Sequence, residues 1–575
     1  MVRSGRVDLA VLEAGDPHRP TIVFIHGYPD TKELWNGVLT RLGRHYHLVA
    51  YDVRGAGESS RPRGTAAYDM ARLGDDLDAV IAAVSPELPV HLVGHDWGAL
   101  QGWEFVTLER FAGKLASFTA IAGPPLELAA HAGEELLRRP TPGGLGALAA
   151  RLRRSWYVVA LCTPGVPTIA WRWMLGGQRW QWLLHNIERV RVGEEPAPTL
   201  VADGIHGSKL YRRNIPRRLV RGRTQAVAHA PVQVVIPTRD HFISPSYYRG
   251  VERLAPVLRR RLVGATHWVP KTEPDLIARW VAQFVDEVEA GSAAGSRAPW
   301  AKGGGLDQLR GRLALVTGAG SGIGRATAAA LKEHGARVLL VDRDQGALAR
   351  AGAQIGAADT FMCDVSDERE MERLCAHVLS RFGVPDVVVN NAGVGVAGPL
   401  LETSSREWRR VIGVNLMGVV HGCRLFGRAL VERGEGGHIV NLASAAAFQP
   451  AKDLPAYAAT KAAVLMLSEC LRAELSPHGI GVTAVCPGFV RTNITRAAHY
   501  AGRGEAQQRL VAERVTRLYE RRNYGPERVA TEILHAIGAD APVAVVTPEA
   551  RVMRALSRFA PSLRRRVAAL DTLPA

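Results

Sequence analysis

Long apolar runs are absent from this 575-residue chain. No stretch reaches the roughly 18 apolar residues that a membrane-spanning helix needs, and the nearest candidate, residues 156–175, is interrupted by Pro164, Pro167 and Arg172. No apolar segment of the kind found in secretion signals follows Met1. These absences predict a cytoplasmic protein without a membrane span.

Cysteine is scarce, and its spacing carries no metal or disulfide signature. The six cysteines contain no CxxC pair and no zinc-finger spacing, and five of them lie in the second half of the chain. This usage is typical of reduced, buried thiols in a cytosolic protein. We therefore expect neither disulfides nor a metal site.

Acidic residues are outnumbered, with 72 Lys and Arg against 55 Asp and Glu and a formal net charge of +17. Such an excess suits nucleic acid or an anionic membrane surface. The arginines form short separate clusters, as in 212–223 and 562–567, without a basic platform interleaved with aromatic residues. We expect no nucleic-acid partner. A solvated basic face is the first interpretation and peripheral membrane contact the second.

The chain is too long for one hydrophobic core, and its composition changes once. Residues 289–305 are rich in Gly, Ala and Ser without apolar periodicity, which predicts a flexible linker between domains at 1–288 and 306–575. In both domains short apolar runs alternate with helix-length segments, the pattern of α/β folds with parallel strands buried on both faces. The expected strands are 21–27, 47–52, 90–96 and 232–240, then 313–320, 337–344, 386–393, 437–444 and 482–488.

Residues 126–228 break this rhythm. The segment is rich in Arg and Trp and reads as helical, so we expect a helical cap over the carboxyl edge of the first sheet. Five tryptophans between 156 and 182 fit a cap core and permit a large apolar substrate.

The motif GHDWG at 94–98 places an acid where a strand passes into a helix. This is the turn in which many α/β enzymes hold a serine nucleophile, and here Asp96 stands in its place. A carboxylate at this point attacks carbon and becomes an ester. A lone Asp in a glycine-rich turn is more often a turn or cap residue, so the assignment depends on the other motifs.

Residues 1 to about 288 resemble the epoxide hydrolases of the α/β-hydrolase fold in four elements that follow the family's order: HGYP at 26–29, GHDWG at 94–98, TRDHFISP at 238–245 and GATHWVP at 264–270. The resemblance implies that Asp96 is the nucleophile, that His267 activates water and that Asp240 orients His267. It also implies an oxyanion hole made by the backbone N–H groups of Tyr28 and Trp97.

Two cap segments, YVVALCTPGVP and LYRRN, resemble the segments that carry the family's proton-donating tyrosines. Tyr157 and Tyr211 would then donate hydrogen bonds to the epoxide oxygen, with simple packing of buried tyrosines as the alternative. Haloalkane dehalogenases share the aspartate, but they need halide-binding donors, often an Asn where this chain has Tyr28. Epoxide hydrolysis is therefore favoured over dehalogenation, and an idle lipid-binding module is a third interpretation. The histidines interpreted as structural are His26, His95 and His241.

A glycine-rich turn, TGAGSGIG at 317–324, follows an apolar strand in the second half and opens a helix. Its glycines let backbone N–H groups approach a pyrophosphate. Asp342 ends the next strand, where a carboxylate binds ribose hydroxyls and repels the extra phosphate of NADP. Arg343 beside it opposes that preference. NAD is the expected cofactor, and NADP stays open.

With the later motifs VNLMG, NLASAAA and YAATK, residues from about 306 onward resemble the short-chain dehydrogenase/reductase family. The resemblance implies a catalytic tetrad of Asn415, Ser444, Tyr457 and Lys461. Tyr457 is then the acid/base, with Lys461 on the same helix face lowering its pKa, while Ser444 positions the substrate oxygen and Asn415 supports a proton-relay water. The implied cofactor-binding residues are Gly318, Ser321, Gly322, Ile323, Gly324, Asp342, Asp364, Val365, Asn391, Tyr457, Lys461 and Thr492.

The order of the two halves resembles the EphD-type fusions of actinobacteria. That resemblance implies a bifunctional enzyme that converts a lipid-like epoxide to a vicinal diol and oxidises a hydroxyl. The resemblance of the second half to short-chain dehydrogenases implies a homo-oligomer formed through that domain. At the C-terminus, residues 550–570 alternate apolar residues and arginine at helical spacing around Pro561. The pattern fits a membrane or subunit contact, or a helix pair packed on the dehydrogenase domain.

Overall fold

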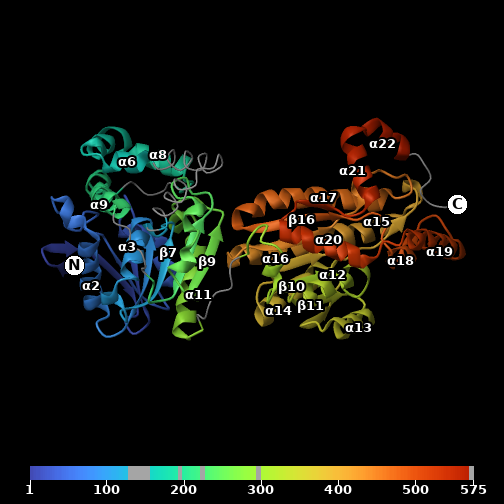
Figure 1. The fold of residues 1–575 in the computed structure, drawn as a ribbon, viewed down its shortest axis with the longest axis horizontal. Coiled ribbons are helices and arrows are strands. Elements are labelled where there is room, and N and C mark those ends of the chain that lie inside the picture. Colours follow the sequence, from blue (N-terminus) through green and yellow to red (C-terminus); the bar gives the residue numbers. More distant parts are fainter. Residues whose placement is uncertain (127, 129–155, 192–196, 221–226, 293–299, 569–575) are drawn as a thin grey trace. The chain divides into compact units, whose positions relative to one another are not determined.

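The computed structural model describes residues 1–126, 128, 156–191, 197–220, 227–292 and 300–568 (Figure 1). The chain divides into two compact units, Met1–Ala298 and Pro299–Ala575. Of the expected linker 289–305, residues 293–299 lie outside the described residues. Trp300 is buried in the core of the second unit, and the Gly305 N–H donates to Gly538 O. Residues 300–305 are therefore attached to the second unit at both ends, although residues 301–305 are exposed.

The first unit is built on a seven-stranded sheet in which β3 is antiparallel and the other neighbours are parallel. In spatial order its strands are β3 (Val11–Gly15), β5 (His47–Tyr51), β4 (Thr21–Ile25), β6 (Val90–His95), β7 (Leu115–Ile121), β8 (Val232–Pro237) and β9 (Leu258–Val263). A separate hairpin joins β1 (Val2–Ser4) and β2 (Val7–Leu9). The four strands expected in this unit are present.

Helices cover both faces of this sheet because its strands bury side chains on both sides. Val23 and Ile25 of β4 join the core beneath α2 (Met70–Val84) and α3 (Trp97–Phe105). Ile22 and Phe24 join the opposite core, beneath α1 (Asn36–Leu42) and α11 (Pro274–Glu289), which follows the short α10 (Val269–Thr272). This arrangement is the α/β-hydrolase architecture expected from the sequence.

The described part of the segment 126–228 is helical, as predicted. Its helices are α6 (Trp156–Cys162), α7 (Val166–Ile169), α8 (Gln178–Asn186) and α9 (Leu200–Val220), with a π-helical turn at Ala170–Leu175. They contact loops at the carboxyl ends of the strands: the Gly204 carbonyl accepts a hydrogen bond from Tyr28, which follows β4. Residues 127, 129–155, 192–196 and 221–226 of the expected cap lie outside the described residues.

The second unit is a Rossmann-type parallel sheet. In spatial order its strands are β12 (Asp359–Met362), β11 (Arg337–Asp342), β10 (Leu313–Thr317), β13 (Val387–Asn390), β15 (Gly437–Leu442), β16 (Ile480–Cys486) and β18 (Val543–Val545). All neighbours pair in parallel. A short parallel pair joins β14 (Val396–Ala397) and β17 (His499–Tyr500).

Helices also cover both faces of the second sheet. One core contains residues of α14 (Glu368–Phe382), α16 (Gly418–Arg433) and α17 (Pro455–Leu475). The other contains residues of α12 (Gly322–Glu333), α13 (Gln345–Ile355) and α20 (Pro526–Ala539). The remaining helices are α15 (Ser405–Ile412), α18 (Ile494–Ala497), α19 (Glu505–Arg522), α21 (Pro548–Phe559) and α22 (Pro561–Ala568).

Two further expectations from the sequence concern membranes and thiols. Among the described helices, none has both the length and the apolar character needed to cross a membrane. All six cysteines are free. Four are buried as expected, whereas Cys162 is half-buried and Cys470 is exposed, so the expectation of uniformly buried thiols was wrong for these two.

Candidate active sites

Asp96 occupies a strained turn between β6 and α3. Its backbone adopts φ 49° and ψ −116°, a conformation that is costly for a residue with a side chain and that is concentrated at functional sites. The neighbouring glycines make the turn sterically feasible, because a Cβ on Gly98 would lie 2.1 Å from the Ile25 carbonyl oxygen. Likewise, a Cβ on Gly27 would lie 2.7 Å from Asp96 Oδ2. The strained backbone of Asp96 and the two neighbouring glycines thus place one carboxylate at the turn between β6 and α3.

The Asp96 carboxylate is contacted from two sides. The Tyr28 N–H donates to its Oδ2 at 2.9 Å, and His267 Nε2 lies 3.6 Å from its Oδ1. Trp97 is the first residue of α3, so its N–H belongs to the helix turn whose donors have no intrahelical acceptor. The structure therefore brings both expected oxyanion residues beside the expected nucleophile.

His267 is held in turn by Asp240. Its Nδ1 lies 2.7 Å from Asp240 Oδ2. The other oxygen, Oδ1, accepts the backbone N–H groups of Phe242 and Ile243 at 2.7 and 2.9 Å. The buried Asp240 carboxylate is thereby fixed, and it fixes the ring orientation of His267.

Asp96 and His267 stabilise each other's charged forms. Burial opposes a charged imidazole, but Asp240 and Asp96 outweigh it and raise the pKa of His267 well above its ordinary value. Burial also opposes ionisation of Asp96, yet the hydrogen bond and charge of His267 lower the pKa of Asp96. An ionised Asp96 therefore favours a protonated His267, and a protonated His267 favours an ionised Asp96.

The two cap tyrosines reach the same place from different helices. Tyr211 of α9 packs edge to face on Trp97, with ring centroids 4.8 Å apart, and on Tyr28 at 5.3 Å. Tyr157 of α6 packs on Phe242 at 5.4 Å, and Phe242 packs on His267. Burial first and the Asp96 charge second raise the pKa of Tyr157, and the same two causes raise that of Tyr211. Both phenols therefore stay protonated beside the carboxylate.

Tyr28 has a second role that the sequence did not predict. Its hydroxyl donates to the Gly204 carbonyl at 2.9 Å and accepts the Trp171 indole N–H at 2.6 Å. Both partners lie in the cap. The residue whose backbone contacts Asp96 is therefore tied by its side chain to the cap.

Glu188 is a residue beside this site that sequence reasoning missed. Its carboxylate is completely buried and accepts the His267 backbone N–H at 3.0 Å, while its other oxygen lies 2.9 Å from His241 Nδ1. Its carbonyl accepts the Thr266 hydroxyl at 2.7 Å. The available signal was weak: Glu188 is the first acidic residue after a carboxylate-free run from 136 to 187.

The three histidines interpreted as structural have structural contacts. His26 accepts the Val53 N–H at 2.9 Å. His95 Nε2 lies 3.0 Å from the His267 carbonyl oxygen, and burial lowers the pKa of His95 to about 4. His241 pairs with Glu188. His95 and Glu188 thus hold the His267 backbone at its carbonyl and its N–H.

In the second unit the glycine-rich turn has the conformation that a pyrophosphate cradle needs. Gly318 and Gly322 have φ of 63° and 54°, which favours glycine. A Cβ on Gly324 would lie 2.2 Å from the Gly318 carbonyl oxygen, so the helix could not approach the turn with a larger residue. Helix α12 begins at Gly322 and points its free N–H groups at the turn.

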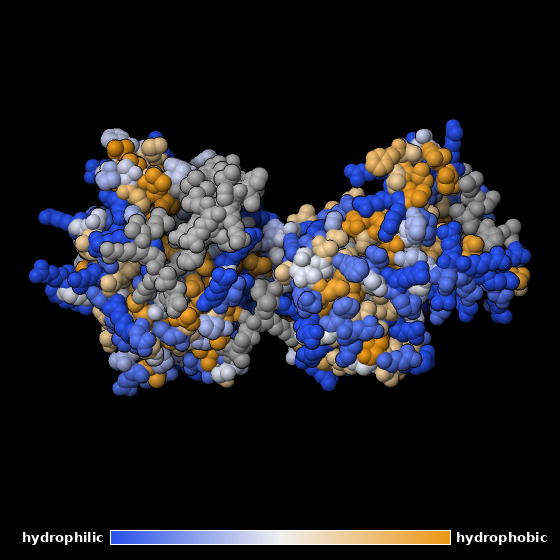
Figure 2. Space-filling model, in the orientation of Figure 1, coloured by the Kyte–Doolittle hydropathy of each residue, from blue (hydrophilic) through white to orange (hydrophobic). Residues whose placement is uncertain are grey.

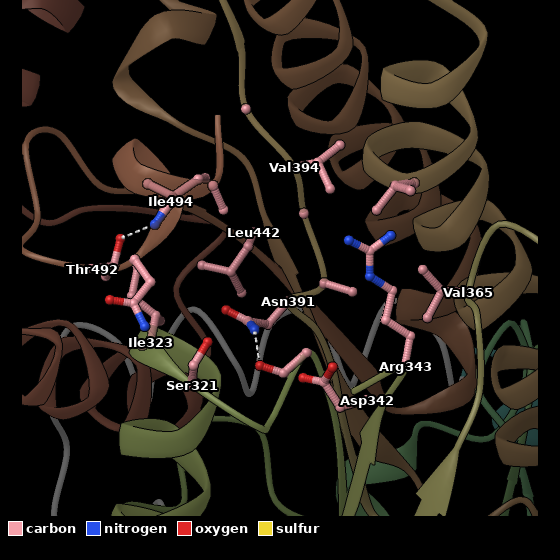
Figure 3. A pocket seen from close by; sticks show the side chains of 18 of the residues that line it. Ser321, Ile323, Asp342, Arg343, Val365, Asn391, Val394, Leu442, Thr492 and Ile494 are labelled. Carbon is pink, nitrogen blue, oxygen red and sulfur yellow. Dashed lines mark hydrogen bonds between the residues drawn. The ribbon is translucent and has the colours of Figure 1, made fainter. Parts of the chain in front are cut away.

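A pocket opens above this turn (Figure 3). All the expected cofactor-binding residues line it except Gly324, which supports the turn from behind. At one end Asp342 Oδ2 accepts the Gly320 N–H at 2.8 Å, and Arg343 lies beside it. Arg410 of α15 also lines the pocket and was not predicted. The residues that line the pocket are therefore those expected to hold a dinucleotide, which supports the sequence resemblance independently.

Two of the expected cofactor contacts are also structural ties. Asn391 donates its side-chain amide to the Thr317 and Gly318 carbonyls at 2.9 and 3.1 Å, which joins β13 to the glycine turn. Asp364 Oδ1 accepts the N–H and the hydroxyl of Ser366. On the opposite side of the pocket the Thr492 hydroxyl accepts the Ile494 N–H at 3.4 Å (Figure 3).

Two of the four expected tetrad residues, Tyr457 and Lys461, line this pocket, and Ser444 and Asn415 lie beside them. Tyr457 and Lys461 line it from α17, and Ser444 is close enough to Tyr457 to oppose the rise of the Tyr457 pKa. Asn415 lies in a π-helical turn, Gly413–Met417, where it accepts the Val394 N–H at 2.8 Å and donates to the Val394 carbonyl at 3.0 Å. Such π-helical turns are frequent at functional sites.

One expected interaction within the tetrad is absent from the geometry. Burial raises the pKa of Tyr457, the Ser444 hydrogen bond opposes that rise, and Lys461 makes no comparable contribution. Lys461 Nζ lies over the Tyr457 ring, 5.8 Å from its centroid, and donates to the Leu442 carbonyl at 2.6 Å. Burial lowers the pKa of Lys461 to about 8. The ammonium therefore lies over the ring of Tyr457.

Comparisons with known sequences agree with the geometry of each unit. The alpha/beta hydrolase fold family matches residues 20–140, and the short chain dehydrogenase family matches residues 312–501. The protein is thus an enzyme with an α/β-hydrolase domain followed by a short-chain dehydrogenase domain that binds NAD(P).

The whole chain also has relatives of the same length. It is 37% identical to the probable oxidoreductase EphD of Mycobacterium bovis and of Mycobacterium tuberculosis, over 99% of this chain and 97% of each relative. The chain therefore belongs to the EphD family.

Other similarities cover only the second unit. D-threitol dehydrogenase of Mycolicibacterium smegmatis is 38% identical over 36% of this chain and 80% of that enzyme. A crystal structure of a short chain dehydrogenase/reductase from Burkholderia phymatum in complex with NAD is 34% identical, covers 46% of this chain and 99% of its own, and gives a TM-score of 0.41.

Proposed function

We propose that the first unit hydrolyses an epoxide to a vicinal diol through an ester on Asp96. The observation that carries the proposal is the convergence of the Asp96 carboxylate, the His267 imidazole and two protonated phenols, Tyr157 and Tyr211. A carboxylate nucleophile opens a strained ring only if a donor serves the departing oxygen. The cap supplies two such donors.

The first step consumes the ground-state ion pair. Asp96 attacks one epoxide carbon, the ring C–O bond breaks, and the oxygen takes a proton from Tyr157 or Tyr211. The new ester carries no charge, so the carboxylate that stabilised the His267 imidazolium disappears. His267 then gives its proton, through solvent, to the tyrosinate that the first proton transfer left behind. His267 is now neutral and can act as a base.

The second step returns every group to its starting state. His267 Nε2 takes a proton from water, and the hydroxide adds to the Asp96 carbonyl carbon. The Tyr28 N–H, which already lies 2.9 Å from an Asp96 carboxyl oxygen, stabilises the tetrahedral oxyanion together with the Trp97 N–H. Collapse of the tetrahedral intermediate expels the second diol oxygen as an alkoxide. The alkoxide takes the proton of the regenerated Asp96 carboxylic acid, which leaves Asp96 as a carboxylate.

The ester has a signature that direct attack by water lacks. In a single turnover in water enriched in oxygen-18, the label should enter the Asp96 carboxylate, and the diol should stay unlabelled. Mass spectrometry of the peptide that contains Asp96 and of the diol measures both. Label in the diol alone would overturn the covalent mechanism. Halide release from alkyl halides, with no turnover of epoxides, would instead identify a dehalogenase. If Asp96→Ala left every reaction of the protein at the wild-type rate, the first unit would be an idle module.

For the second unit we propose oxidation of a secondary alcohol with NAD as the preferred cofactor. NAD, held by the residues that line this pocket, would supply the hydride acceptor. Tyr457 takes the hydroxyl proton, Ser444 positions the same oxygen, and Lys461 and Asn415 hold the surrounding polar network. Asp342 favours NAD because its carboxylate, held by Gly320, would face the extra phosphate of NADP.

The cofactor preference is testable at one residue. In Asp342→Ala the repulsion is gone while Arg343 and Arg410 still line the pocket. We expect the ratio of kcat/KM for NADP over NAD to rise at least about tenfold, the equivalent of about 1.4 kcal/mol. Steady-state kinetics with both cofactors measure it, and an unchanged ratio would refute the role of Asp342.

We also propose that the two reactions run in series, from a lipid-like epoxide through a vicinal diol to a hydroxyketone, because the product of the first offers the hydroxyl that the second needs. Mass spectrometry of a long-chain epoxy-fatty ester incubated with and without NAD tests the order. Asp96→Ala should convert added diol but no epoxide, and Tyr457→Phe should stop at the diol. Failure of wild type to oxidise the diol would separate the two activities.

A homo-oligomer through the second unit rests on the family resemblance, and sedimentation velocity tests it.

A further inference from the structure

The C-terminal helices α21 and α22 carry a surface that neither proposed reaction uses. Residues 550–568 contain six arginines and no acidic residue. Arg554, Arg558, Arg565 and Arg566 are exposed, and none forms an ion pair with a described residue. Among them Val552, Phe559 and Leu563 are exposed, Phe559 to 79%. We call these seven residues the arginine face.

The arginine face has nothing packed on it in the described structure. No residue of α22 is buried, although a helix in a folded domain normally buries one stripe of side chains. In Figure 2, hydrophobic surface and projecting hydrophilic side chains alternate where Figure 1 places α21 and α22. The combination of exposed apolar side chains and unpaired cations is that of a helix pair built to contact an interface.

The helix pair is attached to the loop that carries a catalytic residue. Arg564 Nη1 donates to the Phe448 carbonyl at 3.3 Å, and the Gln449 side-chain amide donates to the Arg564 carbonyl at 3.1 Å. These loop residues follow the turn Ala445–Ala447, which begins at Ser444 and contacts α21. Whatever binds the arginine face therefore binds next to the loop that follows Ser444.

The chemistry of the arginine face selects one kind of partner. A second copy meeting it through the same surface would set arginine against arginine, which is repulsive. Phe559, Leu563 and Val552 gain little from a nucleic-acid backbone but gain burial in the boundary between headgroups and acyl chains. We propose that the arginine face docks the second unit on an anionic phospholipid bilayer. Its link to a lipid-like substrate rests on the proposed function, whereas the docking itself does not.

The test uses the full chain with vesicles of phosphatidylcholine containing phosphatidylglycerol, and vesicles of phosphatidylcholine alone. Each arginine near an anionic surface contributes about fivefold in affinity, so Arg558→Glu with Arg565→Glu and Arg566→Glu should weaken binding at least about a hundredfold. Phe559→Ser with Leu563→Ser should weaken it without removing its salt dependence. A charge-matched control replaces three exposed arginines elsewhere on this unit, Arg350, Arg369 and Arg428, with glutamate.

Wild type and the control should co-sediment with the anionic vesicles at low salt, release at high salt and ignore the neutral vesicles. Cofactor binding, measured by nucleotide fluorescence, should be equal in all variants and shows that each has folded. Absence of wild-type binding at low salt would overturn the proposal. Equal loss in the control would attribute binding to the net charge of +17 alone, and a change of oligomeric state in the triple variant would point to a second copy; both outcomes overturn it.

Discussion

Replacing Glu188 with alanine should slow epoxide hydrolysis and leave substrate affinity nearly unchanged. The substitution removes the acceptor of the buried His267 N–H, now 3.0 Å from the carboxylate. An unsatisfied buried donor costs about 1–3 kcal/mol. The His241 contact adds less than about 1 kcal/mol, because the His241 side chain is 53% exposed and solvent screens the pair. The free energy of unfolding of the first unit should fall by about 2–3 kcal/mol.

The effect on the rate follows from how the His267 backbone is held. Glu188 holds its N–H and His95 holds its carbonyl, so losing Glu188 leaves one attachment. The catalytic distance is the 3.6 Å between His267 Nε2 and Asp96 Oδ1. A displacement of about 1 Å at such a position costs up to about a hundredfold in rate. We expect kcat to fall about ten- to a hundredfold with KM unchanged.

Two control variants separate position from charge. Glu188→Gln keeps an oxygen that accepts the His267 N–H, and His241→Ala removes only the exposed partner, so both should stay within about threefold of wild type. Steady-state kinetics on a soluble epoxide and hydrogen exchange at the His267 amide provide independent measurements. Faster amide exchange is expected in Glu188→Ala alone. Wild-type kcat in Glu188→Ala, or equal damage in Glu188→Gln, would refute positioning by this hydrogen bond.

Two further predictions concern the charged groups of each site. His267→Gln should open the epoxide but fail to activate water, so that Asp96 carries a stable adduct of the substrate mass; an intact-protein mass spectrum without the adduct would contradict the assigned order of steps. In Lys461 the folded pKa of about 8 lies below the ordinary value of 10.5, so burying the ammonium opposes folding below pH 8 by about 3 kcal/mol, and this cost disappears as the pH rises towards 10.5. Lys461→Met should therefore, even after losing the bond to Leu442, stabilise the second unit by about 2 kcal/mol at pH 7. Calorimetry at pH 7 and pH 10 should show that gain shrinking with pH, and a constant or inverted difference would exclude the buried charge as its cause.

The sequence predicted the strands that are apolar on both faces, and it missed those that are not. In β7, Ser117 and Thr119 interrupt the apolar run, although both side chains are buried and Ser117 hydrogen-bonds to His91. Edge strand β9 contains three consecutive arginines, of which Arg259 pairs with Glu287. A polar residue whose partner lies far along the chain looks like a break in the pattern. Unbroken apolar runs therefore identify strands well, whereas buried polar residues hide a strand both in the interior of the sheet, as in β7, and at its edge, as in β9.

The candidate sites divide in the same way. Asp96, Asp240 and His267 lie in motifs whose spacing can be read directly, and the structure brings them together. Glu188 and the Tyr28 hydroxyl act through contacts between the cap and the core. Their partners lie far away in the sequence, so no local sequence pattern predicts these contacts. The Lys461 ammonium was placed on the correct helix face, but its distance from the Tyr457 hydroxyl depends on side-chain packing that spacing does not encode.

The double attachment of Tyr28 links the admission of substrate to the readiness of the nucleophile. Its N–H serves the Asp96 carboxylate while its hydroxyl bridges Trp171 and Gly204 of the cap. Any movement that lifts these cap residues must either break two hydrogen bonds or pull the oxyanion loop with them. The oxyanion loop is therefore held in place only while the cap is closed over it. Substitutions that remodel the cap to change the substrate range must keep the hydrogen bonds of the Tyr28 hydroxyl to Trp171 and Gly204.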